Sequence, residues 1–302
     1  MRRAMLVAFA SVAISAPTVA LLLQGGDAPA PNVNAFRGLG AWIDVFDYVP
    51  AFVDRPGPPA VMTETVDDLA LLGTDTIYLQ AAIDDPRANG LVVDRKLVGA
   101  LLRRAHAKGV RVVAWYYPQL VDPVRDRRRV EALADFRARG ERFDAIALDI
   151  ESRQVPDLTE RDNRVVELAR QVRKAAGRRP VGAIVYPAVQ LEVVNPALWP
   201  EFPYRRLARH VDVWLPMAYW TYREDPYRDA SRYTKESVRR LRNNLGDPAA
   251  AVHPIGGLGA LSNPQDYQRF VRAARAVHAV GWSVYDADTT STTAWRLLRA
   301  SR

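Results

Sequence analysis

The chain has 302 residues, of which 49% are hydrophobic and 25% are charged, and its formal net charge is +8. This composition excludes a disordered or fibrous chain. The complete absence of Cys excludes disulfides and attachment through a lipidated cysteine. The positive charge comes almost wholly from Arg, since Lys occurs only at positions 96, 108, 174 and 235. No nucleic-acid recognition motif accompanies it, so we expect no nucleic-acid partner.

The first 23 residues have the pattern of an export element. Arg2 and Arg3 precede an almost uncharged run, which predicts either a signal peptide or an N-terminal membrane anchor over residues 1–23. Residues 24–36 form a linker rich in Pro, Gly and Asn, and Ala-Pro-Ala at 28–30 is a candidate cleavage site that the following Pro31 disfavours. We therefore expect a domain that is secreted, or tethered at the extracytoplasmic face of a membrane.

Short apolar runs alternate with amphipathic segments from residue 37 onward, which predicts strands alternating with helices. The expected strands cover 38–44, 76–80, 111–117, 145–151, 181–186, 213–219, 252–256 and 282–286. The expected helices cover 64–72, 95–107, 128–139, 160–176, 204–209, 231–245, 264–280 and 293–299. Eight such units favour an α/β fold of the (β/α)8 TIM-barrel type, forming one domain over residues 37–302. A doubly wound open sheet is the alternative, although it usually has fewer strands.

The fourth expected strand ends with two carboxylates, Asp149 and Glu151. Because strand side chains alternate between faces, both point the same way, with Ala147 below them. Their Cβ atoms should lie about 6.5–7 Å apart, which suits the paired carboxylates of glycoside hydrolysis. The alternative is an ordinary strand end with solvated acids.

Other strand ends add acids and aromatic rings, and in a barrel these ends meet at the catalytic face. Carbohydrate sites combine carboxylates with flat rings that stack on sugars. We expect Trp115, Trp214 and Trp295 to be buried. The candidate substrate-binding residues are Trp42, Asp44, Tyr117, Tyr186, Trp220, Trp282 and Asp286.

The fourth strand resembles the D-G-x-D-x-D-x-E signature of glycoside hydrolase family 18, the chitinase-like barrels. Asp144, Asp149 and Glu151 match that pattern, whereas Ala145 and Ala147 replace its Gly and its middle Asp. The run Met217-Ala218-Tyr219-Trp220 is similar to the family's M-x-Y-D, with Trp in place of Asp, and Gly281-Trp282 stands near the family's Trp at the floor of the sugar site.

This resemblance implies catalytic roles for Glu151 as general acid, Asp149 as the orienting carboxylate and Tyr219 as a helper. The missing middle Asp weakens the case for assistance by a substrate N-acetyl group. A second resemblance, to family 25 lysozyme-type barrels, depends on Asp44 at the end of the first strand and on the Asp149 and Glu151 pair. A barrel of an unassigned glycosidase family is a further alternative.

The chemistry of either family requires one carboxyl group that stays protonated and another that is ionised. We expect the proton on Glu151, nearer the mouth of the barrel, and the charge on Asp149. Asp44, Asp286 and Asp288 are lesser candidates for activating water or binding hydroxyl groups.

The four histidines form no ligand pattern, so we predict neither a metal site nor a cofactor, and His253 is expected in the core. The glycines at 256, 257 and 259 predict a tight loop rather than a phosphate site.

Two functions follow from this pattern. The first is an exported glycoside hydrolase whose partner is a cell-wall or extracellular polysaccharide. The second is a catalytically silent barrel that binds glycans or envelope proteins, because a fold alone does not imply an activity. The enzyme should depend on Glu151, whereas the binding protein should depend on the aromatic side chains of Trp42, Tyr219 and Trp220.

Overall fold

The computed structural model describes residues 32–53, 57–88 and 90–300. The expected export segment, residues 1–23, and most of the expected linker lie outside these residues. Within the described ranges, no helix combines the length and the apolar character needed to cross a membrane.

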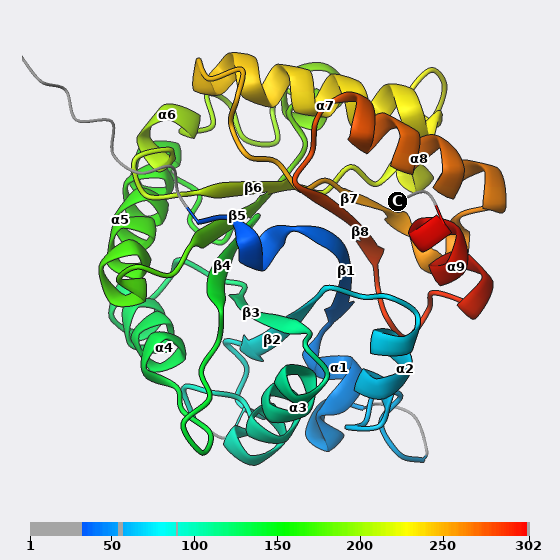
Figure 1. Ribbon diagram of the computed structural model, residues 1–302. Helices are drawn as coiled ribbons and strands as arrows, with labels where there is room; N and C mark the ends of the chain where they lie inside the picture. Colours follow the sequence, from blue (N-terminus) through cyan, green and yellow to red (C-terminus); the bar gives the residue numbers. More distant parts are fainter. Residues whose placement is uncertain (1–31, 54–56, 89, 301–302) are drawn as a thin grey trace, which may run out of the picture. The chain divides into compact units, whose positions relative to one another are not determined.

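Eight parallel strands form the barrel, in the order β6-β5-β4-β3-β2-β1-β8-β7 (Figure 1). Isolated parallel bridges from Trp214 of β6 to Val252, and from Met217 to Ile255 of β7, close the ring. The TIM-barrel prediction is therefore confirmed. The strands are β1 (Gly38–Ile43), β2 (Thr76–Ala82), β3 (Arg111–Tyr116), β4 (Ala145–Ile150), β5 (Val181–Val185), β6 (Val213–Pro216), β7 (Ile255–Leu258) and β8 (Gly281–Tyr285).

Helices surround the strands (Figure 1), and most of the long ones begin at an Asp or Asn side chain that accepts hydrogen bonds from the first turn. The α-helices are α1 (Val45–Tyr48), α2 (Thr65–Leu71), α3 (Arg95–Ala107), α4 (Pro123–Asp135), α5 (Leu158–Ala176), α6 (Tyr204–Leu207), α7 (Ala230–Leu245), α8 (Pro264–Ala276) and α9 (Thr292–Ala300). Shorter turns are η1 (Asn34–Phe36), η2 (Pro50–Phe52), η3 (Gln190–Val194), η4 (Trp220–Tyr222) and η5 (Gly259–Leu261).

The expected start of the helix at residue 128 was wrong, because α4 begins at Pro123. The side chain of Asp122 accepts hydrogen bonds from the backbone nitrogens of Val124 and Arg125, and Pro occupies the first helical position. The longer helix also buries Arg129. The arginine-rich run at residues 125–129 therefore contributes a buried side chain to the packing of α4.

Aromatic rings fill the interior of the barrel. Phe36 lies at the end where the strands begin, with its ring centroid 6.1 Å from that of Tyr78. Gly182 accommodates the Phe36 ring, because a Cβ atom there would lie 2.8 Å from it. Tyr78 then stacks on Trp42. Since η1, which carries Phe36, crosses the centre of the ring (Figure 1), the last residues of the expected linker belong to the barrel core.

His253 is a buried core residue, as expected. Its Nδ1 lies 2.8 Å from the carbonyl oxygen of Phe36, and its Nε2 lies 3.0 Å from the hydroxyl oxygen of Ser283. Burial lowers the pKa of His253 to about 4, so the imidazole is neutral at pH 7. This network fastens η1 to β8 across the barrel floor.

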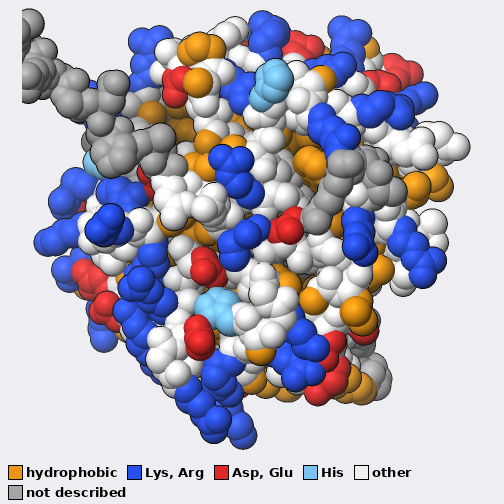
Figure 2. Space-filling model, viewed as in Figure 1, with side chains coloured by type: hydrophobic (Ala, Val, Ile, Leu, Met, Phe, Trp, Pro, Cys, Tyr) orange, Lys and Arg blue, Asp and Glu red, His pale blue; other side chains and the backbone are white. Residues whose placement is uncertain are grey.

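The positive charge is distributed rather than gathered on the face that carries η1. Lys and Arg side chains lie around the periphery of that face, interspersed with Asp and Glu (Figure 2). Several arginines of the chain are paired, as in the contacts of Arg104 with Asp67 and of Arg173 with Asp212. The net charge therefore does not by itself mark a binding surface there.

Candidate active site

Asp149 and Glu151 lie at the C-terminal end of β4, on the end of the barrel that we call the mouth. Along β4, Ala145 and Ala147 face the interior, whereas Ile146, Leu148 and Ile150 face the helices. The same alternation directs Asp149 inward, where it is 8% exposed, and Glu151 follows it one step nearer the solvent. The structure therefore brings these two sequence-predicted residues together.

Asp149 lies in an environment that favours its neutral form. Its Oδ1 atom is buried and has no hydrogen-bond partner in the part of the chain that the structure describes. Burial, followed by the charge of Glu151, raises the pKa of Asp149 well above its usual range, and burial also raises the pKa of Glu151. Both carboxyl groups therefore favour their protonated forms. This direction agrees with the expected proton on Glu151 and opposes the expected charge on Asp149.

Four tyrosines pack on top of the interior core at the mouth: Tyr117, Tyr186, Tyr219 and Tyr285. The hydroxyl of Tyr186 donates a hydrogen bond of 3.2 Å to the backbone oxygen of Glu151. The ring centroids of Tyr219 and Tyr285 lie 6.3 Å apart. We call these four residues the tyrosine cluster.

The tyrosine hydroxyls remain protonated near neutral pH. Burial, with the charges of Asp149 and Glu151, raises the pKa of Tyr219 well above its ordinary value. Burial raises the pKa of Tyr186 to about 12. Tyr219 can therefore donate a hydrogen bond to an oxygen of a ligand, whereas the hydroxyl of Tyr186 already donates to the backbone oxygen of Glu151.

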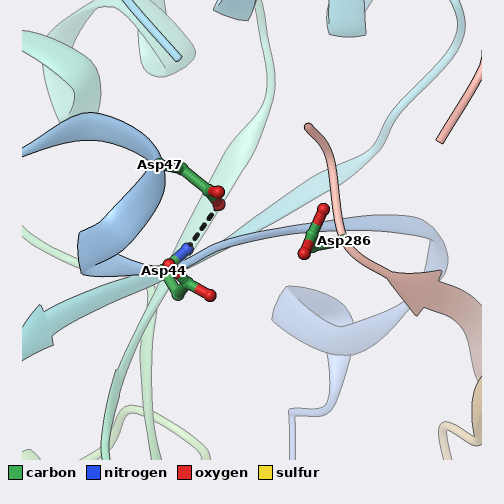
Figure 3. A group of neighbouring side chains, drawn as sticks. All are labelled: Asp44, Asp47 and Asp286. Atoms are coloured by element: carbon green, nitrogen blue, oxygen red, sulfur yellow. Dashed lines mark hydrogen bonds between the residues drawn. The ribbon is translucent and has the colours of Figure 1, made fainter. Parts of the chain in front are cut away.

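A second acidic group lies between the ends of β1 and β8, where Asp44, Asp47 and Asp286 each place a carboxylate oxygen within 4.8 Å of the others (Figure 3). Asp44 caps α1 by accepting from the nitrogen of Phe46 at 2.8 Å. Asp47 accepts in return from the nitrogen of Asp44 at 2.9 Å. The hydroxyl of Tyr285 donates to Asp44 as well.

This second group is explained by the helix cap. Burial, then the charge of Asp44, raises the pKa of Asp47 to about 8. Burial raises the pKa of Asp44, and the hydrogen bond from Tyr285 opposes that effect. Three carboxylate oxygens could hold a hard cation, but the cap hydrogen bonds and the proton on Asp47 already account for the arrangement. We assign no metal to it.

Three predicted substrate-binding tryptophans do not reach the mouth. Trp42 lies inside the barrel, below it, where its Nε1 donates to the hydroxyl of Ser283 at 2.8 Å. Trp282 faces the helices, because strand alternation turns it away from the interior, and its Nε1 donates to the oxygen of Leu298 at 3.2 Å. These side chains therefore pack the fold, and we remove them from the candidate site.

Trp220 is the third of these corrections. It is 1% exposed and packs between β7 and α8, with its ring centroid 5.1 Å from that of Phe270. Gly256 leaves the space for it, since a Cβ atom there would lie 2.8 Å from the Trp220 ring. The expected tight loop was wrong for Gly256 and Gly257, which lie within β7 and leave space for the Trp220 ring.

Two residues of the mouth were absent from the sequence-based site. Tyr285 contacts Asp44, and its direction follows from the alternation that also turns Ser283 inward. Asp47 follows Asp44 by three residues, the spacing of a capping box. Both signals were present in the sequence.

Comparison with known proteins supports the fold. No protein-family model matches the sequence, and no curated protein is significantly similar to it. An endo-β-1,4-mannanase from Thermotoga petrophila superposes with a TM-score of 0.61 at 10% identity, covering 84% of this chain and 69% of the mannanase. The spore cortex-lytic enzyme SleL of Bacillus megaterium gives 0.61 at 7% identity, covering 88% and 74%. A glycoside hydrolase family 18 chitinase from Cycas revoluta gives 0.60 at 12%, covering 87% and 99%. The chain therefore has a barrel of the type found in glycoside hydrolases.

Proposed function

We propose that this chain is an exported glycoside hydrolase that cleaves a cell-wall or extracellular polysaccharide, with Glu151 as its general acid. One observation carries the proposal. Two carboxyl groups with raised pKa values, those of Asp149 and Glu151, lie at the mouth of the barrel beside the tyrosine cluster. Active sites of this fold lie at that end. Glycoside hydrolysis also requires a carboxylic acid that remains protonated near neutral pH.

In the proposed mechanism, Glu151 transfers its proton to the glycosidic oxygen of the leaving group as the bond between that oxygen and the anomeric carbon breaks. The carboxylate that results stabilises the cationic sugar, and it then takes a proton from the water molecule that adds to the anomeric carbon. The same negative charge strengthens the hold of Asp149 on its proton, so Asp149 stays neutral. Tyr219, whose hydroxyl also stays protonated, donates a hydrogen bond to an oxygen of the reacting sugar.

The proposed location and substrate have separate support. The uncharged run after Arg2 and Arg3 has the pattern of an export element, which suits an enzyme of the cell envelope or its surroundings. A spore cortex-lytic enzyme and a chitinase share the barrel. Their names refer to the spore cortex and to chitin. We propose a cell-wall or extracellular polysaccharide for the present chain.

The alternative of a silent glycan-binding barrel has less support. It depended on an aromatic rim formed by Trp42, Tyr219 and Trp220, and the structure buries both tryptophans away from the mouth. The side chains that remain at the mouth are carboxyl groups and tyrosine hydroxyls. That set suits proton transfer better than stacking alone.

The test compares the full-length chain with its Glu151→Gln variant on a panel of bacterial wall and extracellular polysaccharides, by assay of new reducing ends. We expect the variant to lose about 10²–10⁴-fold in rate, the usual contribution of general acid catalysis. Glu160→Gln is the control, because Glu160 lies on the exposed part of α5. Equal rates for the unaltered chain and the Glu151 variant, or no cleavage of any polysaccharide, would refute the proposal.

A further inference from the structure

A cavity of about 800 Å³ lies between the segment that follows β2 and the first turns of α4. Asp84 and Asp85 line it from that segment, and Arg125, Arg128 and Arg129 line it from the helix. Because β2 ends and α4 begins at the C-terminal end of the barrel, the cavity lies at the same end as the mouth. Its volume falls within the range of ligand-binding sites, about 300–1,000 Å³.

The cavity is separate from the proposed catalytic groups. None of its lining residues belongs to the tyrosine cluster or to the pair of Asp149 and Glu151. The segment between β3 and α4 connects the two regions, since the hydroxyl of Ser152 donates to the backbone oxygen of Gln119 at 3.0 Å. Asp122, which caps α4, ends the same segment and lines the cavity.

The other carboxylates of the lining are already paired with guanidiniums. One oxygen of Asp84, Oδ1, accepts from Nη1 of Arg125 at 3.0 Å and from Nη2 of Arg129 at 3.1 Å. Asp85 accepts from the backbone nitrogen and from the guanidinium of Arg87. These acids are therefore not the groups that need a ligand.

Two of the guanidiniums, in contrast, retain donors without partners. Arg129 is 6% exposed, and its Nε and Nη1 atoms are buried without a hydrogen-bond partner in the part of the chain that the structure describes. The ring of Tyr116, 5.9 Å from Cζ of Arg129, offsets part of the charge but supplies no acceptor to these nitrogens. Arg128 is exposed on the lining and forms no ion pair or hydrogen bond with a described residue.

We propose that this cavity binds an oxyanion, with Arg128 and Arg129 as its donors. Guanidinium groups match carboxylate and phosphate oxygens through charge-assisted hydrogen bonds, which are about twice as strong as those to a neutral hydroxyl. Carboxylate and phosphate present the same acceptor oxygens, and the test distinguishes them. The inference goes beyond the proposed function, because this site holds its ligand whether or not the barrel cleaves a polysaccharide.

The test follows the arginine Nε–H signals of the full-length, ¹⁵N-labelled chain by nuclear magnetic resonance. Sodium phosphate, sodium acetate or glucose is added at constant ionic strength, with sodium chloride as the reference. We expect a saturable shift of the Arg129 signal, with half-saturation in the millimolar range, for phosphate, for acetate or for both. Absence of saturation with both anions would overturn the inference, and so would an equal response to glucose or to chloride.

Arg128→Gln should weaken the binding of the anion about tenfold, because a hydrogen bond to a charged group is lost while the Arg129 signal remains available. Arg127→Gln is the matched control. Arg127 is exposed one residue earlier on the same helix, does not line the cavity and lies 3.8 Å from Glu131. Unchanged affinity in Arg128→Gln, or an equal loss in both variants, would also overturn the inference.

Discussion

Trp42 and Tyr78 stack face to face inside the barrel, with ring centroids 4.3 Å apart and ring planes inclined by 10°. Both side chains are buried. The pair lies between Phe36 at the floor and the tyrosine cluster at the mouth. The ring centroids of Trp42 and Tyr285 lie 6.4 Å apart. The stack therefore supports the site from below.

Trp42→Ala should destabilise the protein by about 3–5 kcal/mol, because it removes a large buried ring and leaves a cavity. Denaturant unfolding followed by circular dichroism measures this loss. Tyr222→Ala is the comparison, since that side chain is 60% exposed and its removal should change the free energy of unfolding by no more than about 0.5 kcal/mol. Similar stability of the two variants would contradict the role that we give to the stack.

Tyr219→Phe should reduce the turnover number about 10–100-fold, the effect of losing a hydrogen bond to a developing charge. The measurement is the rate of cleavage of the substrate identified with the unaltered chain. Tyr222→Phe serves as control, because its ring centroid is 6.5 Å from that of Tyr219 and its side chain faces solvent. An unchanged turnover number in Tyr219→Phe would remove this hydroxyl from the mechanism.

Asp47→Asn should make the protein more stable at pH 8 than the unaltered chain. The pKa of Asp47 rises from 3.8 to about 8 on folding, so its contribution to stability is complete below about pH 4 and is lost as the pH rises to about 8. Asn can still accept the hydrogen bond from Asp44, but it never ionises. The gain at pH 8 should be on the order of 3–5 kcal/mol.

Unfolding by denaturant at pH 4, 6 and 8 tests this prediction. The difference between Asp47→Asn and the unaltered chain should increase at each step. Asp68→Asn, on the exposed face of α2, is the control substitution. A constant difference across this pH range would mean that Asp47 does not titrate as proposed.

The pattern along β4 shows what the sequence can predict. Alternation places Ala147, Asp149 and Glu151 on one face, and the structure keeps that arrangement because a strand leaves no other choice. That the environment would also favour the neutral form of Asp149 could not be predicted in this way. This property depends on burial, which is set by the side chains that surround the mouth.

Trp42, Trp220 and Trp282 show why composition misleads. An aromatic residue near a strand end suits both sugar stacking and core packing, and the choice depends on the space left by distant residues. For Trp220 that space is provided by Gly256, and for Trp42 it is provided by Tyr78 and the hydroxyl of Ser283. Neither relationship is contained in a local sequence window.

The aromatic side chains of Phe36, Tyr78 and Trp42 divide the barrel into a filled lower part and an open mouth. With its lower interior filled, the barrel can receive a ligand only in the layer formed by the last residues of the strands and by the loops beyond them. A polysaccharide substrate of the proposed enzyme would therefore lie across the mouth instead of threading into the barrel. Substitutions in the loops can then alter which polymer fits, while the stability of the floor is left intact.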